Sequence, residues 1–135
     1  MMQVRIIIFA LLVQAPIPYR MVSSRESGPT ETIKEVDYSI SVNQYLDVAR
    51  ARNIVCALIR EKKPQKYDVL SIGIYYQLEG DSPEMTELRE RRLVQYHWSK
   101  DSPNDARRLV LTKDAKGQPL PNWRFYNFDH TKSCR

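Results

Sequence analysis

The feature that most constrains this chain is a change in the period of its apolar residues near Pro64. Before this residue, apolar side chains recur at helical spacing from Ser41 to about Lys62. After it, apolar and polar residues alternate, as in strands that bury one face. A helix followed by consecutive strands predicts an α+β roll, in which one sheet curls around one helix.

The helical segment is amphipathic, and Ser41 is its expected N-cap. Its expected buried half contains Val48, Ala49, Val55, Cys56, Leu58 and Ile59. Arg52 falls in the middle of this half, where two interpretations remain open. Either its apolar stem lies along the interface and the charge reaches water, or it is a ligand-facing or ion-paired cation.

Four segments after the helix are expected to be strands. The clearest alternation is in "YDVLSIGIYYQLEGD", which starts at Tyr67, and the others are "RRLVQYHWS", "ARRLVLT" and "NWRFYNFD". Gly117 and the prolines of "KDAKGQPLP" predict a hairpin-type loop between the last two. The predicted fold class is therefore α+β, with one main N-terminal helix packed on a curved antiparallel sheet of about four strands.

This order of elements is similar to that of the cystatin-like and nuclear-transport-factor-2-like rolls. The similarity concerns architecture alone, because both folds serve many functions. A cystatin inhibitor would carry Gln-x-Val-x-Gly in its first hairpin loop. The stretch "YYQLEGD" has the Gln and the Gly without that pattern, so the sequence indicates no family.

The tripeptide Asp-Ser-Pro occurs twice, at Asp81 and Asp101, and Arg-Arg-Leu-Val follows each copy. Asp and Ser bond to nearby backbone amides and Pro fixes φ, so each copy marks a loop before a strand. The first copy also predicts a short helix with Ser82 as N-cap and Pro83 at its first position.

If the two Arg-Arg-Leu-Val strands pair as an antiparallel hairpin, their arginines lie at opposite ends of it. The expected neighbours are Arg107 and Arg108 with His97 and Trp98, and Arg91 and Arg92 with Thr112 and Lys113. The repeat therefore predicts two similar loops, each followed by a strand, rather than one concentrated arginine patch.

The beginning of the chain predicts export. One basic residue precedes the run from Ile6 to Ala15, which is almost wholly apolar and too short to span a bilayer. Cleavage could follow Ala15 or lie near Ser24, and the alternative is that the run is a buried β-strand. We predict residues 1–24 as a signal peptide or N-terminal apolar segment and residues 25–135 as a single α+β domain, without a stable membrane span.

The two cysteines also bear on whether the protein is exported. Cys56 and Cys134 lack a C-x-x-C partner or a neighbouring histidine cluster, which disfavours zinc. A disulfide between them would close a loop of 134 − 56 = 78 residues. The alternative is a buried free thiol at Cys56 and an exposed one at Cys134. We expect the disulfide, and with it a secreted or periplasmic protein.

The sequence contains no recognisable catalytic, cofactor or metal-ligand signature. The net charge is +5, and the last 50 residues hold the whole excess, which can attract acidic partners. We expect a non-enzymatic binding or inhibitory protein that contacts another protein through a sheet face or edge. The candidate binding residues are Arg52, Tyr96, His97, Trp98, Arg107, Arg108 and Trp123.

Two other functions remain open at this point. One is a small-ligand-binding or enzymatic roll, whose cavity would contain Arg52, Tyr96 and Trp98. The other is a basic module for single-stranded nucleic acid, because "NWRFYNFDH" interleaves aromatic and basic residues. A general acid/base role for Asp129 and His130 would need an enclosed pocket and a positioned partner.

Overall fold

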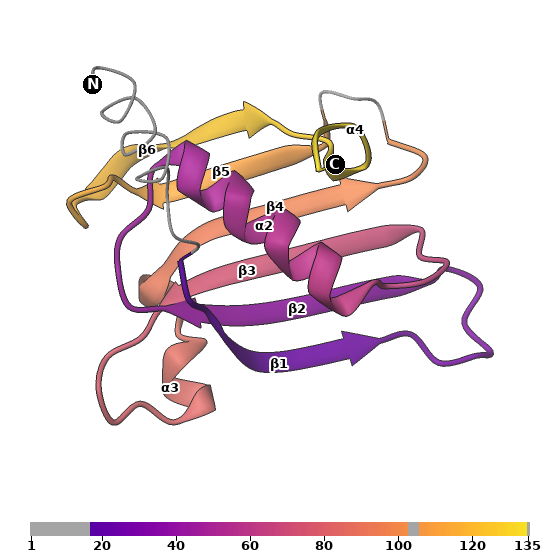
Figure 1. The fold of residues 1–135 in the computed structure, drawn as a ribbon, viewed down its shortest axis with the longest axis horizontal. Coiled ribbons are helices and arrows are strands. Elements are labelled where there is room, and N and C mark those ends of the chain that lie inside the picture. Colours follow the sequence, from indigo (N-terminus) through magenta and orange to yellow (C-terminus); the bar gives the residue numbers. More distant parts are fainter. Residues whose placement is uncertain (1–16, 103–105, 135) are drawn as a thin grey trace, which may run out of the picture.

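The computed structural model describes residues 17–102 and 106–134, which contain one six-stranded sheet in the order β1-β2-β3-β4-β5-β6 (Figure 1). The strands are β1 (Arg20–Glu26), β2 (Glu35–Val42), β3 (Val69–Tyr76), β4 (Arg92–Ser99), β5 (Arg108–Lys113) and β6 (Pro119–Asn127). The helices are α2 (Val48–Lys62), α3 (Pro83–Thr86) and α4 (His130–Ser133), and a 3-10 turn, η1, spans Arg89–Arg91. Strands β2 and β3 run parallel, and the other neighbouring pairs are antiparallel.

The predicted fold class is wrong. We expected an N-terminal helix on a curved antiparallel sheet of about four strands, as in a cystatin-like or nuclear-transport-factor-2-like roll. The sheet is mixed and has six strands, and two of them precede α2, which is the one helix of seven or more residues in the described chain. Helix α2 connects β2 to its parallel neighbour β3. A parallel pair requires such a crossover because the chain must return to the end of the sheet where it started.

Strand β2 also corrects the predicted start of the helix. Ser41, our expected N-cap, lies within β2, where it is buried and its Oγ donates a hydrogen bond to Gln77 Oε1 at 2.8 Å. The strand has an alternating pattern, with four buried apolar residues at every second position: Val36, Tyr38, Ile40 and Val42.

Helix α2 begins and ends with clear local signals. Asp47 is the N-cap, and its Oδ1 accepts a hydrogen bond from the backbone N–H of Arg50 at 2.8 Å. At the other end, Lys63 adopts a left-handed conformation and its N–H bonds to the carbonyl of Ile59. The predicted end at Lys62, ahead of Pro64, is confirmed.

One face of the sheet is covered by α2, which crosses it diagonally (Figure 1). The helix buries Ala51, Ile54, Val55, Cys56 and Leu58 in the same apolar cluster as the inner face of β2 to β5. Val55, Cys56 and Leu58 were predicted correctly, whereas Ala49 is exposed. The inner positions of the sheet include Ile72, Tyr96 and Leu109, which are fully buried.

Two local predictions about turns are confirmed. Ser82 caps α3, with Pro83 at its first position, and the Ser82 Oγ accepts a hydrogen bond from the Met85 N–H at 3.2 Å. Gly117 lies in the turn between β5 and β6 with φ of +84°, and a Cβ added there would lie 2.4 Å from the ring of Tyr45. Both the backbone angle and the close ring therefore require glycine at this turn.

The predicted signal core lies outside the described residues through residue 16. Strand β1 starts at Arg20 and pairs with β2 as far as Glu26. The predicted boundary between residues 24 and 25 thus falls inside a strand of the sheet.

Candidate binding face and C-terminal polar network

The face of the sheet opposite α2 remains open along β4, β5 and β6, in the described residues. Side chains alternate along a strand, so Val110 and Thr112 lie on the face opposite the buried Leu109 and Leu111. The register pairs His97 with Arg108, Arg108 with Asn127, and Val110 with Phe125. We call the outward side chains of this region the open face: Arg92, Gln95, His97, Arg108, Val110, Thr112, Trp123 and Phe125.

Two large rings of the open face are exposed to solvent. Trp123 is 40% exposed and Phe125 is 58% exposed. The guanidinium carbon of Arg92 lies 5.7 Å from the centroid of the Trp123 ring, and that of Arg108 lies 5.5 Å from the Phe125 ring. Both distances are within the range of cation–π attraction. The open face therefore presents two ring–arginine pairs on neighbouring outward positions of β6.

The two Arg-Arg-Leu-Val phrases supply these arginines in the same way. The first arginine of each phrase has a carboxylate partner: Arg91 binds Asp81, and Arg107 Nη1 lies 2.7 Å from Asp129 Oδ2. The second arginine of each phrase lies over a ring of the open face. As predicted, the two pairs lie at opposite ends of the β4–β5 hairpin, because Arg108 is opposite His97.

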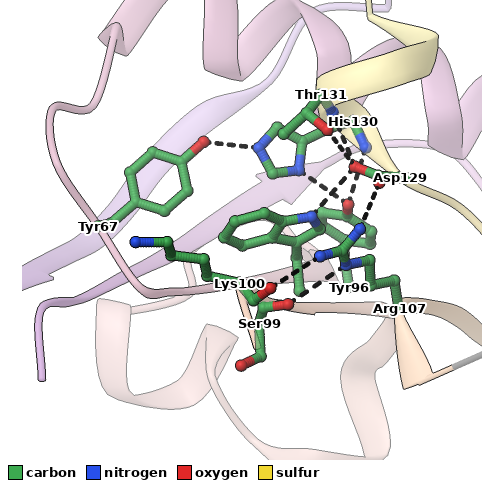
Figure 2. A network of polar contacts seen from close by, with 9 residues as sticks. Tyr67, Tyr96, Ser99, Lys100, Arg107, Asp129, His130 and Thr131 are labelled. Atoms are coloured by element: carbon green, nitrogen blue, oxygen red, sulfur yellow. Dashed lines mark hydrogen bonds and ion pairs between the residues drawn. The ribbon is translucent and has the colours of Figure 1, made fainter. Parts of the chain in front are cut away.

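A second region gathers polar side chains under the end of the chain, and Figure 2 shows it. We call it the C-terminal polar network, and it comprises Tyr67, Tyr96, Trp98, Arg107, Asp129 and His130. His130 is its centre and is only 3% exposed. The ring Nε2 lies 2.6 Å from the Tyr67 hydroxyl, and the ring Nδ1 lies 2.9 Å from the Tyr96 hydroxyl.

The backbone of His130 makes a third contact with the same tyrosine hydroxyl. The N–H of His130 donates to the Tyr96 hydroxyl oxygen at 3.0 Å, so the hydroxyl proton is available for Nδ1. In the tautomer with the proton on Nε2, Nδ1 accepts from the Tyr96 hydroxyl and Nε2 donates to the Tyr67 hydroxyl. Burial, assisted by the charge of Arg107 and opposed by that of Asp129, lowers the pKa of His130 to about 4. The ring is therefore neutral near pH 7.

Asp129 connects the network to the sheet and to α4. It is the N-cap of α4, and its carboxylate accepts hydrogen bonds from the Trp98 Nε1 at 3.0 Å and the Thr131 N–H at 3.0 Å. Burial alone would raise the pKa of Asp129, but these hydrogen bonds and the charge of Arg107 lower it below the usual value. Arg107 also donates to the carbonyls of Ser99 and Lys100 at 3.2 Å and 3.0 Å.

A covalent link completes this attachment of the C-terminal segment. Cys56 of α2 and Cys134 form a disulfide with a Cα–Cα distance of 5.1 Å, which confirms the predicted pair. The segment after β6 is thus held to the helix by the disulfide and to β4 by the network.

The candidate binding residues divide among three places. His97, Arg108 and Trp123 lie on the open face, whereas Tyr96, Trp98 and Arg107 belong to the C-terminal polar network. Arg52 lies on α2 with its guanidinium 5.8 Å from the Phe128 ring, and its Nε is buried without a hydrogen-bond partner in the described chain. The structure therefore does not bring the seven residues together in one site.

Sequence reasoning missed one residue of each ring–arginine pair on the open face and one tyrosine of the network. Phe125 and Arg92 were not chosen, although Phe125 is two positions from Trp123 and so shares its face. Tyr67 offered no signal, because its contact with His130 spans 63 residues of sequence. The described residues contain no group of three or more His, Cys, Asp or Glu side chains that could hold a metal ion.

Comparisons with known proteins assign no identity. The chain matches no protein-family model, no curated protein and no solved structure. Within the residues that the structure covers, no helix has the length and apolar character needed to cross a membrane.

Proposed function

We propose that the protein is an exported, non-enzymatic binding protein that contacts another protein through the open face. The observation that carries this proposal is the pair of exposed rings, Trp123 and Phe125, each with an arginine guanidinium over it. Aromatic and arginine side chains supply much of the binding energy at protein interfaces. A ring buries a large area while fixing few rotatable bonds, and a guanidinium offers several hydrogen-bond donors in a planar fork. Their clustering on a sheet face without a helix is typical of an interaction surface.

Export is the second part of the proposal. The Cys56–Cys134 disulfide supports it, because such bonds persist in oxidising compartments, here secreted or periplasmic. Of the two cleavage positions, the one after Ala15 would leave β1 whole, whereas a cut near Ser24 would remove most of that strand. N-terminal sequencing of protein from its native host tests this part. A soluble cytoplasmic product that retains Met1 would contradict it.

The buried residues favour binding over catalysis. Tyr96 and Trp98, which the alternative of a small-ligand-binding or enzymatic roll would place in a cavity, are packed in ring contacts with His130 at centroid distances of 5.7 Å and 5.1 Å. Both nitrogens of His130 are engaged by tyrosine hydroxyls, and the ring lies away from solvent. A general base needs a nitrogen that can reach a substrate proton, so we interpret this histidine as structural.

The test is capture of the partner by wild-type and variant protein. Purified protein is crosslinked in material from the native compartment, and the captured proteins are quantified by mass spectrometry. The double variant Trp123→Ala/Phe125→Ala should lose the specific partner, while Arg50→Ala, on the solvent side of α2, should retain it. Unfolding midpoints of both variants confirm that they are folded.

A further measurement separates protein from nucleic acid as the partner. Exposed rings with nearby arginines can also stack on bases. Binding of a single-stranded oligothymidylate that weakens steeply with salt and requires Trp123 would replace the protein partner by nucleic acid. Equal capture of one partner by wild type and the double variant would contradict the open face as the binding surface.

A further inference from the structure

One end of the open face is hollowed. The hollow has a volume of about 340 Å³, and it is lined by Glu90, Arg92, Thr112, Lys113, Pro119 and Trp123. These residues come from η1, from β4 and β5, and from β6. Trp123 and Pro119 supply an apolar wall, and two of the lining residues are cations. The hollow therefore combines a ring, a basic pair and a shape open to solvent.

Arg92 is the least satisfied group of the hollow. Its Nε is buried and lacks a hydrogen-bond partner in the described chain. No carboxylate within residues 17–102 and 106–134 lies at ion-pair distance from it, although its sequence neighbour Arg91 binds Asp81. A guanidinium that is partly removed from water without an acceptor gains when one is supplied, and its planar fork suits a carboxylate.

Lys113 brings a second positive charge to the same place. Its Nζ donates one hydrogen bond to the carbonyl of Glu90 at 2.6 Å, which leaves two of the three ammonium donors for a ligand. The side chain of Glu90 also lines the hollow and carries one negative charge. Two cations and one carboxylate favour a ligand with a single negative charge over a dianion such as phosphate.

We propose that this hollow binds the carboxylate of a glutamate or aspartate side chain of the protein partner. Arg92 and Lys113 bind the carboxylate, and Trp123 packs against the methylene carbons that carry it. The proposal rests on the proposed function, because it assigns a chemical character to the partner that the open face contacts. The basic excess of the last 50 residues has the sign that attracts such an acidic segment.

Fluorine NMR of protein labelled with fluorotryptophan tests the proposal without the partner. The chain has two tryptophans, the nearly buried Trp98 and the exposed Trp123, so the spectrum contains two signals. The Trp123→Phe variant identifies them. The probe is a short blocked peptide with one glutamate between glycines, and the matched control has glutamine in its place.

We expect the glutamate peptide to shift the Trp123 signal in a saturable manner while the Trp98 signal stays constant. Arg92→Gln should weaken this binding about tenfold, the loss typical of one hydrogen bond to a charged group. Glu90→Gln should strengthen it severalfold, because it removes the like charge from the hollow. Added salt should weaken binding to wild type.

Two results would overturn the carboxylate site. Equal shifts with the glutamine peptide would show that charge is not recognised, and stronger binding of inorganic phosphate would assign the hollow to a different anion. Either result leaves the proposed function intact if capture of the partner still depends on Trp123 and Phe125. Loss of that dependence, with the peptide shift retained, would instead contradict the proposed function.

Discussion

The C-terminal polar network and the open face use the same residue types in opposite ways. In the network, Arg107 has the Asp129 carboxylate and two backbone carbonyls as partners, and its side chain is 13% exposed. On the open face, the next residue, Arg108, lies over the ring of Phe125, which is 58% exposed. Arg107 comes immediately before β5 and Arg108 is the first residue of that strand, and the two side chains go to different regions, so one dipeptide supplies both. The difference shows that the phrase repeats a local conformation while its two arginines serve different purposes.

Removal of the disulfide should have the largest effect on the network side of this comparison. The double variant Cys56→Ser/Cys134→Ser loses a link that closes a loop of 78 residues, worth about 4 kcal/mol in the chain-entropy model. Urea unfolding of oxidised wild type and the variant measures the change. A loss below about 1 kcal/mol would mean that the network alone holds the C-terminal segment.

Substitution of neighbouring arginines compares the two regions directly. Arg107→Ala should lower the free energy of unfolding by about 3 kcal/mol, because it leaves the Asp129 carboxylate without its cation. Arg108→Ala should lower it by no more than about 0.5 kcal/mol, since this side chain is exposed. Equal unfolding midpoints for the two variants would abolish the distinction between the regions.

Acid should weaken the network and leave the open face unaffected. The pKa of His130 is lowered from 6.5 to about 4 in the folded protein, so the unfolded chain binds more protons between these values. The contribution of this residue to stability is therefore largest above pH 6.5 and falls as the pH decreases, by about 2 kcal/mol between pH 7 and pH 5. Urea unfolding at the two pH values measures it, and His130→Gln should remove most of this slope.

The matched control for the pH measurement is His97→Gln, because His97 is exposed on the open face. This variant should retain the slope of the wild type. An unchanged slope in His130→Gln would show that another group causes the acid sensitivity.

The smallest effect is expected for a ring of the open face. Phe125→Ala should change the free energy of unfolding by no more than about 0.5 kcal/mol, because the ring is largely in solvent. The equivalent change at Phe128, which is 5% exposed, should cost about 3 kcal/mol. If Phe125→Ala proved as destabilising as Phe128→Ala, the ring would serve the fold rather than a partner.

The sequence predicted the elements whose signals are local. The alternation of Leu70, Ile72 and Ile74 located β3, and Ser82 with Pro83 located α3. The pairing of Cys56 with Cys134 followed from the presence of two cysteines and from the reach of the C-terminal segment. These features depend on neighbours within a few residues, or on the presence of only two cysteines in the chain.

The remainder depends on contacts between distant residues. The alternation of β2 was present in the sequence, but Ser41 was assigned to the helix because serine is favoured at N-caps and not in strands. That β2 and β3 are parallel depends on the crossover through α2, which no local pattern specifies. The role of His130 depends on two tyrosines from other parts of the chain, so the Asp129-His130 pair alone could not reveal it.

The position of the disulfide also determines how the molecule would respond to mechanical tension. A force applied to the two ends of the chain would be transmitted through the disulfide from Cys56 to Cys134, so it would not extend the segment between them, which contains β3 to β6. Strands β1 and β2 precede Cys56 and would bear the force. The 78-residue separation of the cysteines corresponds to roughly 260 Å of extended chain that stays unavailable until the bond is reduced. The strands that carry the open face would therefore keep their arrangement under a force that had already separated β1 and β2 from the sheet.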